Sequence, residues 1–414
     1  MTKGMIRLTD YRIGIDFGTC YSNIGVCSEH GQATVFGSEV TGYGLPSIFY
    51  HDVVHKNLVG DDAEYFLKLQ GHDPSTFVEN VKLKLLHDGW NLQGGYVTPI
   101  WVASRIMKRL IEIATKEIKK LDPNGRLIHD EAVISVPVGF IDEEYARIEE
   151  AAIKAGIAKV KLILEPVAAA ISYTYSLDSR VREPIFVYDL GGGTVDVVCL
   201  RPRGDLTYEI HKAEGERIGG LMWTERLSEY IVGNYDAKNL QFSRDKTIKN
   251  IFWAIEDMKK LLSSTKFDST LPIDVPMFQE ILKKSSNDAP NLKISRDQFE
   301  FHTSDLLSRT LAIAEKSTTS CGLTTRDRVH VVLSGGGSRM PQIKNGIVNM
   351  LKNKWGIEII NEGSMIHRPE TAIARGAALV TFGFNKEHHI KNYVYFKPND
   401  VLFNAEKTQG GKSA

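Results

Sequence analysis

The sequence holds few cysteines, and their spacing argues against the usual cysteine-based sites. There are four among 414 residues: Cys20, Cys27, Cys199 and Cys321. None of them belongs to a C-x-x-C pair, so the spacing indicates neither a zinc site nor a disulfide framework. Cysteine usage of this kind favours a reducing compartment.

Two further absences narrow the class of protein. Lysine plus arginine number 51 and aspartate plus glutamate number 51, so no net charge attracts nucleic acid or an acidic membrane. No stretch approaches the roughly 20 apolar residues of a membrane helix. We therefore expect no nucleic-acid partner, no membrane partner and a cytoplasmic location.

What the chain does contain is two loops of the same unusual composition. They are Asp16-Phe17-Gly18-Thr19 and Asp189-Leu190-Gly191-Gly192-Gly193-Thr194. Each lies between two β-type runs, and such a hairpin can turn its backbone N–H groups toward an anion. The aspartate would repel that anion unless a cation lay between them. The two loops together predict a duplicated core that holds a polyphosphate and its metal from both sides.

The three glycines of the second loop are the stronger indication of a bound ligand. A turn such as Gly18-Thr19 is usually only a turn, and Asp16 would then be a turn or capping residue. Three consecutive glycines lose much conformational entropy on folding, and close approach of a ligand to the backbone is a good reason to have them. A third run, Gly335-Gly336-Gly337, lies between a strand and a helix, where a ligand can rest on the helix N-terminus.

Two groups of charged residues each allow two interpretations. Glu165, followed by Pro166, lies at a strand-to-helix boundary, where it either complements the helix dipole or orients a water molecule at the edge of a cleft. Position alone favours the first interpretation. The second group shares one predicted helix and consists of Glu256, Lys259, Lys260 and Ser263. A solvated face with i,i+3 and i,i+4 pairs is the default for such a run.

Hydrophobic periodicity predicts an α/β fold in which one arrangement is built twice. Strands are expected at 12–17, 22–27, 33–37, 132–136, 162–164, 184–189, 194–200, 206–214 and 329–334, and helices at 101–121 and 142–155. The pattern restarts at 184, which indicates two similar halves. We expect a first lobe at 11–180 with an inserted subdomain at about 38–98, and a second at 181–384 with an insertion at about 220–305. A C-terminal extension follows at 385–414, and its end is expected to be disordered.

Taken in order, these motifs resemble the ATPase domain of the seventy-kilodalton heat-shock (DnaK-type) chaperones, within the actin-like ATPase superfamily. The resemblance rests on Ile15–Thr19, Glu165–Ala170, Asp189–Asp196, Glu256–Ser264 and Ser334–Pro341. Actins share the two phosphate loops but lack the Glu-x-x-Lys-(Lys/Arg)-x-Leu-Ser helix, so that helix favours the chaperone branch. The resemblance covers roughly residues 11 to 383. It implies an actin-like fold whose two α/β lobes close on Mg-ATP in the cleft between them.

The resemblance also implies a role for each matching residue. Asp16 and Asp189 would hold Mg²⁺ through its water molecules, and Glu165 with Asp196 would place the attacking water. The implied catalytic set is Asp16, Lys82, Glu165, Asp189, Thr194 and Asp196. The implied ATP- or ADP-binding set is Gly18, Thr19, Cys20, Tyr21, Gly191, Gly192, Gly193, Thr194, Glu256, Lys259, Lys260, Ser263, Gly336, Gly337 and Arg339.

Two positions of these sets match the family loosely. The family's phosphate-contacting lysine lies in a segment similar to Phe77–Leu83, so we expect Lys82 in that role, with Lys84 as the alternative. Cys20 stands where the family has threonine. A thiol beside phosphate-binding N–H groups would have a lowered pKa and react with oxidants, although a small residue that merely replaces threonine is the simpler interpretation.

Further departures bear on function. Gly139, Ile141 and Tyr145 replace residues of a patch that, in the family, passes the nucleotide signal to a linker and a peptide-binding domain. No acidic, leucine-rich linker follows Phe384. We therefore expect a chaperone-like ATPase with slow basal turnover and no peptide-binding domain. It would act as a nucleotide-dependent switch for an unknown protein partner, and an exchange factor would be a second partner.

Three other functions fit the same motifs. An actin-like filament protein would polymerise with ATP. A non-hydrolysing ATP-binding scaffold would use the same loops, but the retained acids argue against it: Asp16, Glu165, Asp189 and Asp196. A small-molecule kinase of the superfamily would need a sugar-binding motif, and none is visible in the sequence.

Overall fold

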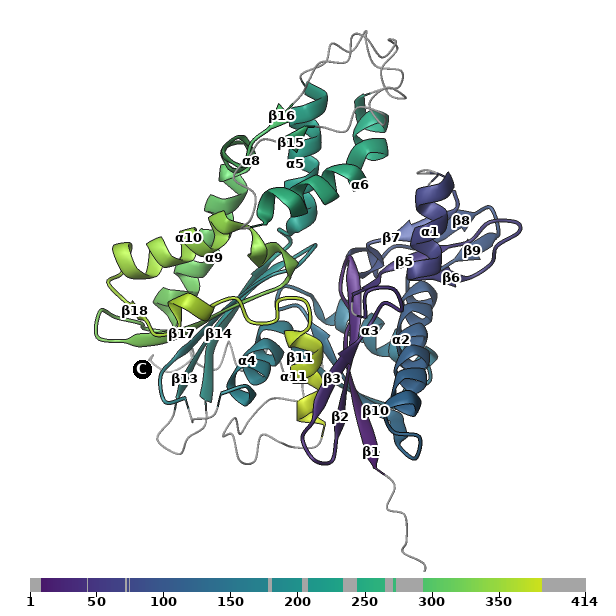
Figure 1. The fold of residues 1–414 in the computed structure, drawn as a ribbon, viewed down its shortest axis with the longest axis horizontal. Helices are drawn as coiled ribbons and strands as arrows, with labels where there is room; N and C mark the ends of the chain where they lie inside the picture. Colours follow the sequence, from purple (N-terminus) through teal and green to yellow (C-terminus); the bar gives the residue numbers. More distant parts are fainter. Residues whose placement is uncertain are drawn as a thin grey trace, which may run out of the picture.

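Two twisted sheets form the centre of the molecule, and helices pack against each of them (Figure 1). The computed structural model describes residues 9–42, 44–70, 73, 75–177, 181–202, 208–233, 244–264, 271–272 and 293–381. The predicted C-terminal extension at 385–414 and much of the predicted insertion at about 220–305 lie outside the described residues.

The first sheet has the strand order β11-β10-β1-β2-β3. Its strands are β1 (Asp10–Asp16), β2 (Tyr21–Ser28), β3 (Ala33–Phe36), β10 (Arg126–Val136) and β11 (Lys159–Leu164), and the short β4 (Leu45–Pro46) pairs with β2. The first three strands form an antiparallel meander, whereas β1 runs parallel to β10. The first loop, 17–20, is the turn between β1 and β2.

The second sheet repeats this arrangement with the order β14-β13-β12-β17-β18. Its strands are β12 (Ile185–Leu190), β13 (Val195–Pro202), β14 (Tyr208–Glu216), β17 (Arg328–Ser334) and β18 (Glu358–Ile359). Here β12, β13 and β14 form the antiparallel meander, and β12 runs parallel to β17. The predicted α/β fold built twice is confirmed, and the second loop occupies the turn that corresponds to the first.

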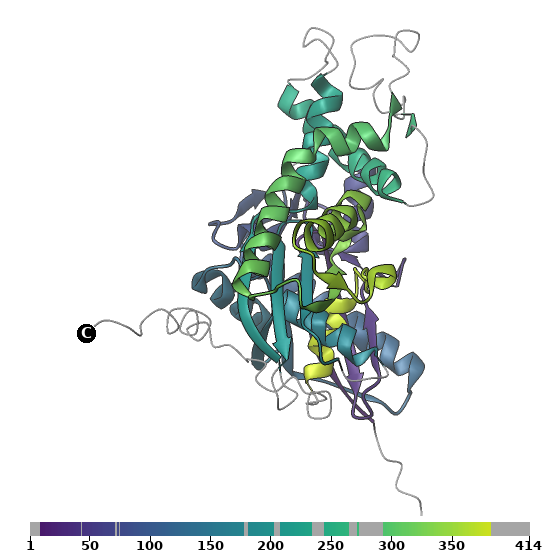
Figure 2. The same ribbon diagram turned by 90° about the vertical axis from the view of Figure 1, so that its left-hand side faces the viewer.

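Helices cover both sheets (Figures 1 and 2). With the first sheet lie α2 (Pro99–Leu121), α3 (Asp142–Lys154) and α11 (Ala372–Val380), and α4 (Glu165–Tyr175) contacts strands of both sheets. On the second sheet lies α9 (Ser304–Ser320), against which α10 (Pro341–Val348) packs. Beyond the end of that sheet, α5 (Gly220–Gly233), α6 (Arg244–Ser263) and α8 (Arg296–His302) pack on one another (Figure 1). Short turns of 3₁₀ or π helix are η1 (Val81–Lys84), η3 (Gly336–Arg339), η4 (Asn349–Lys354) and η5 (Glu362–Ser364). Although α11 falls in the range predicted for the second lobe, it packs on β1, β2 and α4.

The segment between β3 and α2 forms a small unit with its own core. Its elements are β5 (Ile48–Tyr50), β6 (Leu58–Val59), α1 (Asp61–Gln70), β7 (Phe77–Glu79), β8 (Trp90–Leu92) and β9 (Gly95–Val97). Tyr50, Leu67 and Phe77 belong to that core, and Trp253 of α6 packs against it. In the second half, β15 (Leu271–Pro272) pairs with β16 (Lys293–Ile294) beyond α6.

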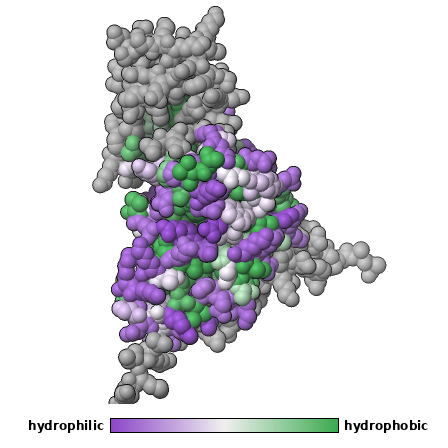
Figure 3. Space-filling model, turned by 90° about the vertical axis from the view of Figure 1, so that its right-hand side faces the viewer, coloured by the Kyte–Doolittle hydropathy of each residue, from purple (hydrophilic) through white to green (hydrophobic). Residues whose placement is uncertain are grey.

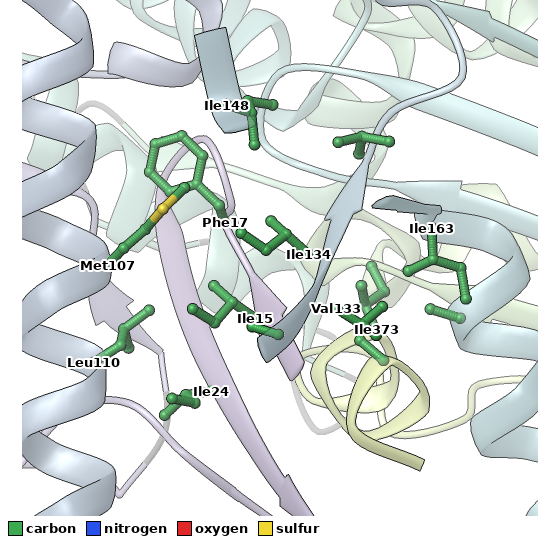
Figure 4. Packing of buried hydrophobic residues seen from close by; sticks show 14 of the residues in the cluster. Ile15, Phe17, Ile24, Met107, Leu110, Val133, Ile134, Ile148, Ile163 and Ile373 are labelled. Atoms are coloured by element: carbon green, nitrogen blue, oxygen red, sulfur yellow. The ribbon is translucent and has the colours of Figure 1, made fainter. Parts of the chain in front are cut away.

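The alternation of side chains along β1 and β2 places two helices on opposite faces of the first sheet. Ile15 and Ile24 lie toward Met107 and Leu110 of α2 (Figure 4). The intervening Gly14 and Gly25 face α11, because a Cβ added to them would meet the backbone of that helix at 2.2 and 2.1 Å. Successive residues of a strand point to opposite faces of the sheet. The isoleucines therefore pack on α2, and the glycines between them leave room for α11 on the other face.

One expectation drawn from the cysteines is wrong. Cys199 on β13 and Cys321, at the end of α9, form a disulfide with their Cα atoms 6.0 Å apart. The two residues are 122 positions apart in the sequence, so their spacing carried no sign of the contact. Cys20 and Cys27 are free.

Hydrophilic and hydrophobic residues are interspersed over the face shown in Figure 3. Within the described part of the chain, no helix is both long enough and apolar enough to cross a membrane.

The crossing of α4 and α11 depends on one glycine. A Cβ added to Gly376 would lie 1.9 Å from the carbonyl oxygen of Ala168, so the two helix backbones meet directly at this point. The approach brings α11 into the angle between α4 and the first sheet, and α4 also contacts β12 of the second sheet. Gly376 therefore helps to join the two halves of the molecule.

We expect Gly376→Ala to lower the free energy of unfolding by about 1–3 kcal/mol, because a methyl group at this site must push two helix backbones apart. The midpoint of urea unfolding measures the change. Gly363→Ala is the matched control, since a Cβ there meets no atom within 4 Å, and it should change stability by less than about 0.5 kcal/mol. Equal stability of the two variants would contradict the close helix crossing.

Candidate active site

Four carboxylates meet where the two sheets face each other. Asp16 ends β1, Glu165 begins α4, Asp189 lies on β12 and Asp196 lies on β13. Their exposed fractions are 8%, 5%, 2% and 0%, respectively, so all four are buried. Aspartate and glutamate are almost never fully buried unless they are paired, and this arrangement therefore needs positive charge.

Lys82 supplies part of that charge. It lies on η1, is 2% exposed, and donates a hydrogen bond from Nζ to Glu165 Oε1. Burial alone would lower the pKa of Lys82, but the charges of Glu165 and Asp16 outweigh burial and raise it. The alternative, Lys84, donates to the backbone oxygen of Glu79 at 3.0 Å. The structure thus brings Lys82 into the carboxylate cluster and leaves Lys84 at its edge.

The cluster carries more negative charge than this lysine neutralises. Burial, and then the charge of Glu165, raises the pKa of Asp16 to about 7 and the pKa of Asp196 to about 7. The same two causes raise the pKa of Asp189 well above its ordinary value. Ser135 donates to Asp16 Oδ1 at 3.2 Å and the Val138 N–H donates to Asp196 Oδ1 at 2.6 Å. These hydrogen bonds favour the ionised forms without cancelling the effect of burial.

Two oxygens of the clustered carboxylates lack a donor in the described part of the chain. Asp189 Oδ1 and Asp196 Oδ2 are buried and have no hydrogen-bond partner among the described residues. Within the same part of the chain, Glu165, Asp189 and Asp196 place carboxylate oxygens within 4.8 Å of one another. Buried polar atoms without partners usually mark a bound ion or water, and all-oxygen ligands suit Mg²⁺. The donor set therefore fits a magnesium ion. Asp16 lies beside this group and not within it.

The two predicted phosphate loops lie directly against each other. A Cβ on Gly192 would meet Cys20 Sγ at 2.4 Å, and a Cβ on Gly193 would meet Thr19 Oγ1 at 2.8 Å. A Cβ on Gly191 would meet nothing nearer than 3.6 Å. Contact between the loops accordingly explains two of the three glycines, and ligand approach is not needed for those two.

Cys20 does not have the chemistry of a reactive thiol. Burial, together with the charge of Glu256, raises the pKa of Cys20 to about 12. Its Sγ lies 4.0 Å from Asn80 Oδ1. The thiolate is the reactive form of cysteine, so the idea of a low-pKa thiol is wrong and the simpler interpretation, a small residue in place of threonine, fits the structure.

The predicted nucleotide-contacting helix, α6, presents two kinds of side chain. Lys259 Nζ donates to Gly220 O at 2.8 Å and to Glu256 Oε2 at 2.7 Å, and Glu256 also accepts from Thr224. Ser263 Oγ donates to Lys259 O at 2.7 Å. These side chains are largely buried, so the alternative of a solvated face does not describe them.

Lys260 differs from its neighbours on α6. Its side chain is 46% exposed and its Nζ lies 3.2 Å from the hydroxyl of Tyr21 and 5.4 Å from the centre of that ring. Because Tyr21 begins β2, this contact joins the second half of the molecule to the first loop. It is a cation–π contact, which at an exposed site contributes about 0.5–1 kcal/mol.

The third glycine run lies next to the second loop. Gly335 has a φ of 76°, in the left-handed region that favours glycine, and a Cβ on Gly337 would meet Leu190 Cγ at 2.7 Å. A Cβ on Gly336 would meet nothing within 4 Å. Arg339 forms an ion pair with Glu370. Gly336 is thus the member of the run whose backbone is open to approach.

Sequence reasoning missed three contributors to the site. Ser135 holds Asp16, and the signal for it was a lone hydroxyl within the apolar strand Ala132–Val136. Thr224 holds Glu256. The backbone N–H of Val138 holds Asp196, and no side-chain pattern can indicate a backbone donor.

A comparison with protein families assigns most of this chain to a known family. A family model described as Hsp70 protein matches residues 72–394, which is most of the chain. The matched range includes Lys82, Glu165, the second loop and the α6 motif. The first loop precedes it.

The raised pKa values predict that Mg²⁺ with ATP or ADP displaces protons from the protein. Asp16 and Asp196, whose pKa values are about 7, carry protons below pH 7 in the absence of a cation. A bound cation favours their ionised forms, so affinity should rise between about pH 6 and pH 8. Calorimetry of Mg-ADP binding in buffers of different ionisation enthalpy measures the released protons. Asp196→Asn should release fewer, and a proton count of zero at pH 7 would contradict the assignment.

Proposed function

This chain belongs to the Hsp70 family and has its actin-like ATPase fold, and from that premise we propose that it binds Mg-ATP between the two sheets and hydrolyses it slowly. One observation carries the proposal. Two buried carboxylate oxygens without donors lie beside the Lys82–Glu165 pair, next to two glycine loops in contact with each other. A carboxylate cluster of this kind suits a metal-bound polyphosphate better than it suits any neutral ligand.

Binding is assigned to groups from both halves of the molecule. The first and second loops and Lys82 would contact the phosphates, and Gly336 with the α6 side chains would contact the adenosine. Asp189 and Asp16 would hold magnesium through its waters, and the ion would neutralise charge on the phosphates. Contact through water does not require Asp16 to belong to the close group of oxygens formed by Glu165, Asp189 and Asp196. Lys82, which donates a hydrogen bond to Glu165, would add a second positive charge.

Hydrolysis is assigned to Glu165 and Asp196, which would orient the attacking water. Val138 occupies one oxygen of Asp196, so Oδ2 is left for the water. The water oxygen bonds to the γ-phosphorus as the bond to the bridging oxygen of ADP breaks. A carboxylate with a pKa near 7 is suited to take the proton at physiological pH. Positioning and charge neutralisation supply most of the catalysis in such a reaction.

We assign to ATP the further role of a switch. Ligand contacts that come from both halves favour the closed arrangement of the molecule. The contact of Lys260 with Tyr21 supports this, because it already joins α6 to the first loop. A protein partner that binds the closed and open states with different affinity would then respond to the bound nucleotide.

Mg-ATP and Mg-ADP should each raise the melting temperature of the protein. Binding stabilises the folded state by about 2.7 kcal/mol at a hundredfold excess over Kd. Without Mg²⁺ the shift should be smaller, since the carboxylates then repel the phosphates. A thermal-shift series with ATP, ADP and EDTA checks this, and a melting temperature that neither nucleotide changes would refute nucleotide binding.

Asp196→Asn and Glu165→Gln should slow steady-state ATP hydrolysis by about 10²-fold and weaken ATP binding far less, because both residues act mainly on the water. Glu131→Gln is the control: its side chain pairs with Lys161 at 2.5 Å, away from the cluster, and turnover should stay within about twofold. If both site variants hydrolyse ATP at the parent rate, their assignment is wrong. If the parent binds ATP without hydrolysing it, the protein is an ATP-binding scaffold.

A further inference from the structure

The two halves of the molecule touch at a second place, directly behind Asp196. The turn from β10 to α3, residues 137–141, lies against the end of β14. There the N–H of Val138 reaches from the first half to Asp196 Oδ1 in the second, at 2.6 Å. Asp196 is 0% exposed, so its orientation depends on the groups that surround it.

Two glycines allow the backbones to approach at this seam. A Cβ on Gly215 would lie 2.6 Å from Asp196 Oδ1 and 2.9 Å from the backbone nitrogen of Gly139. A Cβ on Gly139 would lie 3.2 Å from Gly215 O. The carboxylate of Asp196 therefore lies close to both backbones, and a small separation of the halves would remove its donor.

An ion pair joins the two halves beside these glycines. Arg217, which follows β14, donates from Nη2 to Glu144 Oε1 of α3 at 2.5 Å. Its guanidinium carbon also lies 5.4 Å from the centre of the Phe140 ring. Glu144 is 1% exposed, and its other oxygen accepts the N–H of Ile141 at 3.1 Å as part of a capping box. A buried carboxylate held in this way is costly to leave unpaired.

The turn itself is held from the first half by Tyr145. Its hydroxyl donates to Pro137 O at 2.8 Å, and its ring is buried against Phe140. Tyr145, one of the residues in which this chain departs from the family motif, thus fixes the backbone that carries the Val138 N–H. Arg217 is the corresponding anchor from the second half.

We propose that Arg217 and Glu144 are positioning residues for ATP hydrolysis: their ion pair holds the Val138 N–H against Asp196 and so sets the orientation in which Asp196 meets the attacking water. The inference rests on the proposed hydrolysis. It adds that the first half holds Asp196, through the Val138 N–H, only while the seam is closed. Separation of the halves breaks the ion pair and the Val138–Asp196 hydrogen bond together, which links turnover to the closed state.

The test is steady-state ATPase of Arg217→Ala and Glu144→Gln in the full chain. Glutamine at position 144 can keep the capping-box contact, so that variant removes only the charge. Each should lower kcat about tenfold, because small displacements of a positioned group have effects of this size or larger. KM and the affinity for Mg-ADP should stay within about twofold. Arg217→Lys, which keeps the charge, should recover much of the lost kcat.

Arg226→Ala is the matched control, because Arg226 forms a 2.8 Å ion pair with Asp305 inside the second half and is similarly exposed. It should leave kcat unchanged. The double variant Arg217→Ala with Glu144→Gln should be no slower than either single variant, since the two act through one contact.

The possible failures can be told apart. A parent protein that hydrolyses ATP, with Arg217→Ala at the parent kcat, would overturn this inference alone. A kcat loss in Arg217→Ala that Arg226→Ala shares, or that comes with an equal rise in KM, would also overturn it. A parent that does not hydrolyse ATP would overturn the proposed function and this inference with it.

Discussion

The buried ion pair between Lys82 and Glu165 is the interaction on which the rest of the site depends. It places one positive charge among four buried carboxylates. Burial raises the pKa of the three aspartates, and one lysine does not offset this effect. Desolvated charges of one sign are unstable unless an ion or a ligand completes them. A cation and its phosphate ligand would therefore balance the negative charge of the site. This also explains why Asp189 and Asp196 keep oxygens without donors.

The repeated sheet explains how these charges come together. Each half has an aspartate at or next to the end of a central strand, Asp16 on β1 and Asp189 on β12, and then turns the chain back through a glycine loop. The loops then pack on each other, which requires Gly192 and Gly193. The helices α4 and α11 also pack closely at Gly376, and this contact helps to hold the two halves together. A duplicated arrangement thus supplies two acids and two loops to one place.

Contacts between the halves are of different strengths at different places. The Tyr21–Lys260 contact is partly exposed, whereas Glu144 is buried beneath Arg217. Exposed contacts form and break at small cost. The side chain of Arg217 is also 48% exposed, but loss of its contact leaves the buried Glu144 carboxylate without its charge partner, which is costly. Under the proposed function, closure over the nucleotide and closure of the seam behind Asp196 would therefore respond differently to the same ligand.

From the sequence alone we predicted most strands of the two central sheets and the position of each glycine loop, but no element within 38–98. The sequence also placed the acids at strand ends and indicated the duplication. Those features depend on periodicity and turn chemistry, which act over a few residues. The strands predicted at 12–17 and 184–189 are β1 and β12, for example, and the acids lie where those strands predicted them.

Which side chains and helices contact one another depends on the folded protein as a whole. The tertiary structure separated Lys82 from Lys84, joined Cys199 to Cys321, placed α11 on the first sheet and paired Arg217 with Glu144. Each of these contacts links residues far apart in the chain or depends on the direction of one side chain. The local sequence around each of these residues is compatible with several contact partners. Burial in the folded protein selects one partner, because an unpaired charge or a steric clash in the interior is too costly.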